Sequence, residues 1–277
     1  MRLGLFLVLI LLNPFLKAQN PEKVKPSKGK IYALWGWNRG WYSKSDIRFQ
    51  GNDYDFKLDD VEATDRQTPF SYGTYFGPKT ITIPQTNFRI GYYINENIDI
   101  SFGIDHMKYV MVANQKSNIT GKIENGTDFS GVYNYDQIIL TQKFIRYEHT
   151  DGLNYLNLEI TYNQNLLQLV RLKSNTNKIE LNYLLGFGLG TMMPKSNVTL
   201  MDNDRYDDFH FSGYAFSAKV GINLTFYRFL FLRTEYKGGF THLTDVKTTQ
   251  FESDRARQHF LFTQLNFCFG IAINPFN

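Results

Sequence analysis

The last long stretch of the chain, residues 257–273, alternates between two kinds of side chain. The odd positions are mostly apolar, as at Leu265 and Phe267, whereas the even positions towards the C-terminal end are amide or small, as at Gln264 and Asn266. A period of two predicts a β-strand, and seventeen residues is long against the usual five or six or so. One face of this strand is therefore apolar, and the fold depends on whether that face looks towards a protein core or towards lipid.

Seven more segments alternate in the same way, which gives eight predicted strands in all. They span residues 30–48, 86–94, 98–112, 153–162, 178–192, 210–226 and 229–243. The connections alternate between short turns, such as 95–97, and long loops, such as 50–84 and 113–152. Residues 137–148 within the second of these loops are strand-like, and we expect them to extend the wall. An even number of such segments with alternating connection lengths is typical of outer-membrane barrels.

The sequence therefore predicts an all-β fold: an eight-stranded antiparallel up-and-down transmembrane β-barrel with long extracellular loops and both termini in the periplasm. The apolar face is then the lipid side, because backbone polar groups inside a membrane must be paired, as a closed barrel pairs them. Trp35 and Trp37 share the apolar face of the first strand, and Arg39 on that face indicates either a bulge or the rim of the barrel. A soluble β-sandwich is the alternative fold, but it explains poorly the one-sided aromatic rows.

The N-terminus has the features of an export signal. A basic start at Arg2 precedes a short apolar run over residues 3–12 and a small residue, Ala18, before a plausible cleavage point. The run is too short to span a bilayer as a helix, which takes about 20 residues. We expect residues 1–18 to be a signal peptide, 19–29 a periplasmic tail and 30–277 the barrel. Cys268 is the only cysteine, so the chain can form neither an internal disulfide nor a cysteine metal site.

Polar side chains on the other face of the strands are predicted to line the barrel interior. Counted from the periplasmic ends, most of them fall six or seven residues in, and they form a belt near mid-height with Lys237 and Glu180 adjoining. The predicted belt consists of Asn38, Arg89, Asp105, Glu159, Lys219, Arg233, Glu235 and Asn266. The interior of an eight-stranded barrel is just wide enough for side chains to fill, and unpaired ions there cost several kcal/mol each. We therefore expect a salt-bridged plug and no wide pore; a proton or ion relay is the functional alternative.

The segment Gly36-Trp37-Asn38 is similar to the Gly-Trp-Ser step in the first strand of small outer-membrane barrels of the OmpA-transmembrane and OmpX type. The chain most resembles outer-membrane barrels of the Bacteroidetes over roughly residues 30–273. This resemblance implies a location in the outer membrane of a Gram-negative cell and assembly by the barrel-assembly machinery.

A weaker similarity concerns His149 and Asp151 at the mouth of the fourth predicted strand. The stretch from Glu148 to Asn154 resembles the His-x-Ser-Asn stretch of lipid A deacylase barrels, which use His, Ser and Glu for acyl hydrolysis. Thr150 and Asp151 occupy the neighbourhood where that family needs serine, and the threonine sits one position early. Without a hydroxyl at the nucleophile's position the chemistry cannot run. We therefore treat His149 and Asp151 as a weak outer site and expect no enzyme.

Acidic residues gather in the predicted loops 44–85, 113–152, 193–209 and 244–257, which carry 19 acidic and 14 basic residues. Acidic outer loops suit a surface where divalent cations bridge lipopolysaccharide phosphates. The group Asp202, Asp204, Asp207 and Asp208 lacks the spacing and the glycine of a calcium-binding EF-hand loop, so we expect no metal and no cofactor. No basic groove with interleaved aromatics supports nucleic-acid binding.

The leading functional hypothesis is a structural or surface-interaction protein with a plugged lumen, whose partners are outer-membrane lipid and lipopolysaccharide. A channel for small solutes or hydrophobic ligands is one alternative, and a lipid A-modifying acyl hydrolase is another.

Overall fold

The computed structural model describes residues 27–166, 179–201, 203 and 208–275. The predicted signal peptide, 1–18, and most of the predicted tail, 19–29, lie outside the described residues. The strands are β1 (Ile31–Tyr42), β2 (Ser45–Gln50), β3 (Tyr54–Val61), β4 (Ala63–Thr64), β5 (Thr86–Tyr93), β6 (Ile98–Met111), β7 (Lys116–Ile123), β8 (Gly131–Ile139), β9 (Ile145–Asn165), β10 (Ile179–Pro194), β11 (Asn197–Leu200), β12 (Gly213–Phe226), β13 (Leu230–Lys247) and β14 (Arg255–Ile273), and one short helix is α2 (Tyr72–Phe76). Among these residues, no helix has the length and hydropathy needed to cross a membrane.

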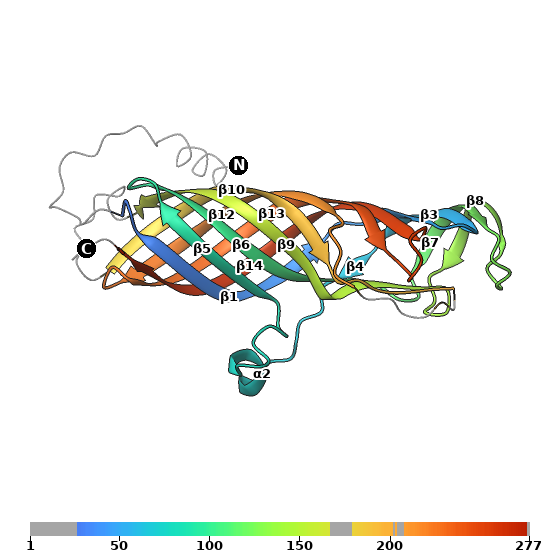
Figure 1. Ribbon diagram of the computed structural model, residues 1–277, viewed down its shortest axis with the longest axis horizontal. Coiled ribbons are helices and arrows are strands. Elements are labelled where there is room, and N and C mark those ends of the chain that lie inside the picture. The colour runs from blue at the N-terminus through green and yellow to red at the C-terminus, as the bar shows by residue number, and fades with distance from the viewer. Residues whose placement is uncertain (1–26, 167–178, 202, 204–207, 276–277) are drawn as a thin grey trace, which may run out of the picture.

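Antiparallel pairing joins the long strands into a sheet that returns to its starting point. The path runs β1-β5-β6-β9-β10-β12-β13-β14, and β14 pairs with β1 from Ile31↔Ile273 to Tyr42↔Phe262. The fold is therefore a β-barrel whose first strand begins where its last strand ends (Figure 1). Each predicted strand overlaps a strand on this path, but 30–48 also covers most of β2, and the described residues contain fourteen strands rather than eight.

The alternation of side chains along these strands separates apolar from charged residues as the sequence predicts. Large apolar side chains lie on the outer face of the wall, where Phe187 is 70% exposed and Leu158 60% exposed. Charged and amide side chains of the same strands point inward, and Lys219 and Glu159 are buried. Successive residues of a strand point to opposite faces, so each strand presents an apolar row outward and a polar row inward. This distribution is the reverse of that in a soluble protein.

Arg39 is exposed on the outer face, and the register of β1 with β14 continues through it without a bulge. Its guanidinium carbon lies 5.6 Å from the centre of the Trp41 ring, also on the outer face. The continuous register excludes a bulge at Arg39, and the rim of the barrel stays the prediction.

The predicted long loops are wrong in one respect, because they contain further strands. Beyond the end of the barrel opposite to Ile31, β2, β3, β7 and β8 continue the sheet from β14, while β11 pairs with β9 and β4 with β6 (Figure 1). We call this region, together with the outer ends of β6, β9, β13 and β14, the extension. The predicted strand 30–48 is in fact two strands with a break at Ser43 and Lys44, and the strand-like segment 137–148 is divided between the end of β8 and the start of β9.

The extension has an apolar core of its own, continuous from strand to strand. Phe56 lies at its centre and packs against Phe49 and Phe144, with ring centres 5.3 and 5.6 Å apart. Other fully buried members include Ile47, Leu58, Tyr109, Ile119, Tyr147, Val198, Leu200 and Val246. The core forms because inward positions on the extension strands are apolar, whereas outward positions carry the acids and lysines that made these segments look like loops.

Candidate functional site: the charged belt and the extension core

The barrel interior holds four buried cations and four buried anions, most of them near mid-height and Asp99 closer to the end at Ile31. Arg89 comes from β5, Lys219 from β12 and Arg233 and Lys237 from β13, while Asp99 and Asp105 come from β6, Glu159 from β9 and Glu235 from β13. All eight side chains are buried. The charges balance, which is the condition for burying ions without a large energetic penalty.

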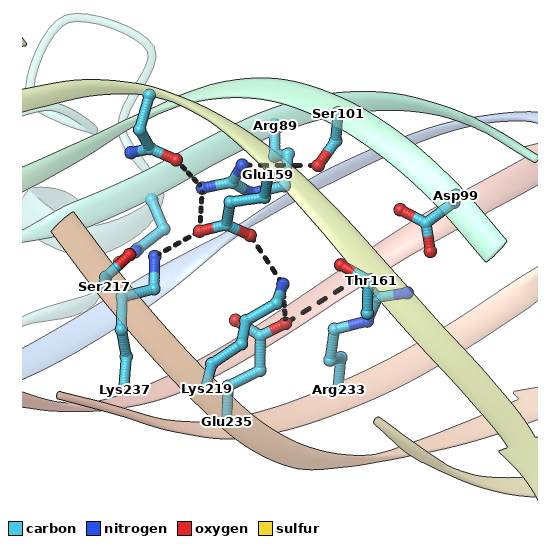
Figure 2. Close-up of polar contacts among 12 residues, drawn as sticks. Arg89, Asp99, Ser101, Glu159, Thr161, Ser217, Lys219, Arg233, Glu235 and Lys237 are labelled. Carbon is cyan, nitrogen blue, oxygen red and sulfur yellow. Dashed lines mark hydrogen bonds and ion pairs between the residues drawn. The ribbon is translucent and has the colours of Figure 1, made fainter. Parts of the chain in front are cut away.

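Glu159 is the centre of this belt (Figure 2). Its carboxylate lies 2.9 Å from the guanidinium of Arg89, 2.7 Å from Nζ of Lys219 and 2.7 Å from Nζ of Lys237. Lys219 also donates to Glu235 at 2.8 Å, and Lys237 also pairs with Asp105. Ion pairs thus link strands on opposite sides of the barrel.

Amide and hydroxyl groups extend the network beyond the ions. Asn38 donates to the Asn87 side chain at 2.7 Å, and Asn87 donates to Asp105 at 2.6 Å. Asp99 accepts from the Tyr32 hydroxyl and from Asn163, both at 2.7 Å. Each buried carboxylate therefore has neutral donors or cations around it.

Arg233 occupies a different environment from the other three cations. Its guanidinium lies 5.1 Å from the ring centres of both Tyr32 and Phe231, donates from Nε to Asn223 at 3.1 Å and lies 3.8 Å from Glu235. Cation–π contact with two rings stabilises a cation that has only a distant carboxylate.

Glycines on the inward face of β10 make room for the belt. A Cβ atom at Gly186 would lie 2.8 Å from Cε of Lys219, and one at Gly188 would lie 2.9 Å from Cγ of Glu159. A larger residue at either position would displace the central ion pairs.

Most of the predicted belt residues lie together in the structure, but the side chain of Asn266 does not bond to the others. Arg89, Asp105, Glu159, Lys219, Arg233 and Glu235 come together as ion pairs, and Asn38 joins them through Asn87. Asn266 is buried, but neither polar atom of its side chain has a hydrogen-bond partner among the described residues. Glu180 is only half-buried near the start of β10, away from the belt's centre. The predicted belt does not include Asn157, Asn163 or Tyr32, which also belong to the network. Each occupies an inward-facing position of its strand, and that position is the sequence signal that identifies it.

The weak outer site does not assemble. His149 is fully buried in the extension core between the rings of Tyr109 and Tyr147, whereas Asp151 is exposed. The imidazole Nδ1 lies 2.8 Å from the Ser196 hydroxyl, a contact that the sequence did not indicate. Its Nε2 has no partner among the described residues, and Glu148 next to it bonds instead to Asn197 and Arg66. A serine and a histidine are adjacent, but the orienting carboxylate that a hydrolytic triad needs does not contact them.

Three of the four aspartates considered for calcium, Asp202, Asp204 and Asp207, lie outside the described residues. Within the described part of the chain no cluster of three or more potential metal ligands occurs.

Burial lowers the pKa of His149 to about 3, and we expect the extension to lose stability in acid for this reason. In the unfolded extension the imidazole takes up a proton below about pH 6.5, whereas in the folded one it stays neutral down to about pH 3. The stabilisation is complete above about pH 6.5 and falls by about 1.4 kcal/mol per pH unit as the pH drops towards 3.

Hydrogen exchange of amides in β3 and β7 between pH 7 and pH 4.5, corrected for intrinsic rates, measures this loss. His149→Leu should flatten the pH dependence, whereas His259→Leu, at an exposed position on β14, should leave it unchanged. An identical slope in His149→Leu and the wild type would contradict the assignment.

Comparison with known structures finds outer-membrane proteins at low similarity. The chain is similar to the outer membrane protein AlkL, solved by solid-state NMR in DMPC bilayers, with 10% identity and a TM-score of 0.40 over 94% of this chain and 98% of AlkL. It is also similar to the outer membrane protein OprG from Pseudomonas aeruginosa (7% identity, TM-score 0.39, 90% of this chain and 97% of OprG) and to the outer membrane protease OmpT from Escherichia coli (12%, 0.27, 92% and 100%). No protein-family model and no curated protein sequence matches the chain.

These similarities are too low to transfer a role, so the function must be argued from the chain's own residues. The narrower resemblance to barrels of the Bacteroidetes stays a prediction.

Proposed function

We propose that this chain is a non-conducting outer-membrane protein: an eight-stranded transmembrane barrel, formed by β1, β5, β6, β9, β10, β12, β13 and β14, that carries a folded extracellular extension. The observation that supports this proposal best is the inverted distribution of side chains, with an apolar outer wall and a charged interior. Water would make such a wall unstable, whereas the hydrocarbon of a bilayer stabilises it.

The apolar wall is much larger than the surface patches of soluble proteins. Such patches rarely exceed a few hundred Å² or so, whereas here most outward side chains of eight strands are apolar and many of them are exposed. The band includes Phe88, Ile90, Ile100, Phe102, Leu158, Ile160, Phe187, Leu189, Phe216, Val220, Ile222, Leu232, Tyr236, Leu265 and Phe267. Aromatic side chains flank it, with Trp41 and Tyr214 towards the extension and Tyr92 and Tyr227 towards the other end. Such girdles mark the two membrane interfaces of outer-membrane barrels.

Two consecutive layers support a closed lumen. The charged belt fills the barrel at mid-height, and the extension core fills the space beyond it with Tyr155, Phe262, Tyr109 and Phe56. An ion would have to break buried salt bridges and then cross an apolar layer, and both steps carry large barriers.

The extension gives this protein its contact with the outside. The β7–β8 hairpin lies at its far tip (Figure 1), and β8 exposes Val132, Tyr135 and Ile139. Among the described strands, β8 pairs only with β7, so the other edge of β8 has no neighbouring strand. We infer a surface-interaction role carried by this tip, held away from the membrane by a rigid apolar core.

Planar-bilayer recording tests the closed lumen. Protein that migrates as a folded barrel in an unboiled gel lane should give no steady conductance at either polarity. Steady conductance from such a preparation would overturn the proposal and support the channel alternative. A changed lipid A profile in cells that carry the protein, abolished by Ser196→Ala, would instead support the hydrolase alternative.

A further inference from the structure

The segment between β4 and β5 has a composition unlike the rest of the extension. Residues 66–84 contain four aromatic residues, three prolines and two cations, but no acid. The acidic residues of the predicted loop all precede this segment. In Figure 1 it stands out from the side of the barrel with α2 at its tip, and we call it the side arm.

The base of the side arm is fixed to the barrel wall. Lys108 on β6 donates to the Ile83 carbonyl at 2.9 Å and to the Thr68 hydroxyl at 3.1 Å. Gln67 donates to Gln85 at 2.8 Å, so the two ends of the arm are also bonded to each other. The arm therefore leaves the wall at a defined place.

The tip of the side arm contacts the apolar outer face of β1 through Trp37. The ring of Trp37 lies 5.4 Å from that of Phe76 and 5.8 Å from that of Tyr75. Trp37 is four residues nearer to the periplasmic end of β1 than Trp41, which lies at the rim. The tip consequently sits below the outer rim of the apolar band, at the level where the wall faces lipid.

Four large apolar side chains of the side arm are exposed, although Phe76 also contacts Trp37. Tyr72 is 78% exposed and Phe70 74% exposed, and Phe76 and Ile83 are also exposed. A free aqueous loop gains nothing from four such side chains, whereas aromatic residues are favoured where a membrane meets water.

Several backbone groups of the side arm are bonded within the arm. Tyr75 N donates to the Ser71 carbonyl at 3.0 Å, and Gly77 N to the Gly73 carbonyl at 3.1 Å. The Thr80 hydroxyl also donates to the Gly73 carbonyl, at 2.6 Å, and the Tyr75 hydroxyl donates to the Thr68 carbonyl at 2.7 Å. Internal bonding of this kind reduces the cost of moving a polar backbone out of bulk water.

From these observations we propose that the side arm is a second lipid-binding element, which inserts its aromatic tip into the interface of the outer leaflet beside the barrel. Its ligand is the lipid of the membrane that surrounds the barrel, and Lys79, which is exposed, supplies a cation for lipid phosphates. The proposal rests on the proposed function, because it needs the outer wall to face lipid. The arm fixes the depth and rotation of the barrel in the membrane and places lipid against Trp37.

Fluorescence quenching at single cysteines tests this proposal. Tyr72→Cys reports on the arm, Phe187→Cys on the middle of the apolar band and Val132→Cys, 84% exposed on β8, on the extracellular tip. Each is made in a Cys268→Ala background, labelled with an environment-sensitive dye and reconstituted in phosphatidylcholine–phosphatidylglycerol vesicles. Lipids with a nitroxide near the headgroup or midway along the acyl chain quench from two depths of the bilayer, and iodide quenches from water.

The label at position 72 should be quenched by the headgroup nitroxide and the label at 187 by the acyl-chain nitroxide. Iodide quenching at 72 should be severalfold weaker than at 132. Quenching of 72 by iodide alone, with 187 still reached by lipid, overturns the side-arm proposal and leaves the barrel intact. Quenching of 187 by iodide and not by lipid overturns the proposed function itself. Protection of 72 from both quenchers identifies a protein neighbour and also refutes the lipid assignment. A label at Phe70→Cys gives an independent result if the first one displaces the tip.

Discussion

We expect the substitution Glu159→Gln to lower the free energy of unfolding of the barrel by about 3–5 kcal/mol, because removal of one partner of a buried ion pair leaves the opposite charge without compensation. Glu159 accepts from three cations, Arg89, Lys219 and Lys237, at 2.7–2.9 Å. In the variant, four buried cations face three anions. Urea unfolding of protein refolded in vesicles, followed by tryptophan fluorescence, measures the loss.

The double variant Glu159→Gln/Lys219→Met separates charge balance from packing. It restores equal numbers of cations and anions, and the remaining cations keep Asp105 or Glu235 nearby. We expect the double variant to recover part of the stability that the single variant loses. Glu62→Gln, which removes an exposed pair with Lys44, should change stability little. Equal stabilities of Glu159→Gln and the wild type would contradict the structural role of the belt.

The strands and their inward and outward faces could be predicted from the sequence because both follow from a period of two. Leu265 and Phe267 are exposed and Gln264 and Asn266 are buried, as their parity predicts. Parity alone does not specify which inward residues meet. Lys237 on β13 reaches Asp105 on β6 and Glu159 on β9 across the interior, and this pairing depends on the stagger between strands.

The extension was missed because its composition resembles that of a loop. In β3, Phe56 and Leu58 alternate with acidic and basic residues. Together with Asp53, the residues Asp55 and Asp59 give this stretch the acidic composition of a surface loop. Acids on one face of a strand are what an extracellular sheet needs on its water side. An alternation of only eight residues, flanked by charged residues, therefore predicts a polar loop rather than a strand.

The outer site was predicted wrongly because strand alternation breaks near it. His149 and Asp151 share parity and should share a face, yet one is buried and the other exposed. Gly152 has φ of +132°, a conformation that only glycine adopts readily, and β6 shifts register against β9 between Met107 and Tyr109. The irregularity reorients Asp151 and leaves His149 inside the core.

The substitution Phe56→Ala should destabilise the extension by about 3–5 kcal/mol without unfolding the barrel, because it removes a buried aromatic ring and leaves a cavity. Phe56 contacts Phe49, Phe144 and Tyr54 at the centre of the extension core. Backbone amides of β3 and β7 should therefore exchange with solvent about 10²- to 10³-fold faster, since each 1.4 kcal/mol or so is a factor of ten. Amides of β12 within the barrel should keep their protection.

Val132→Ala is the matched control, since it shortens an apolar side chain of the extension that is already in water. We expect it to leave exchange in β3 and β7 unchanged. If Phe56→Ala also leaves those amides protected, the extension does not depend on its apolar core, and the second barrier proposed for the lumen is lost with it. If amides of β12 exchange faster as well, the extension and the barrel unfold as one cooperative unit, and the charged belt and the apolar core stabilise each other.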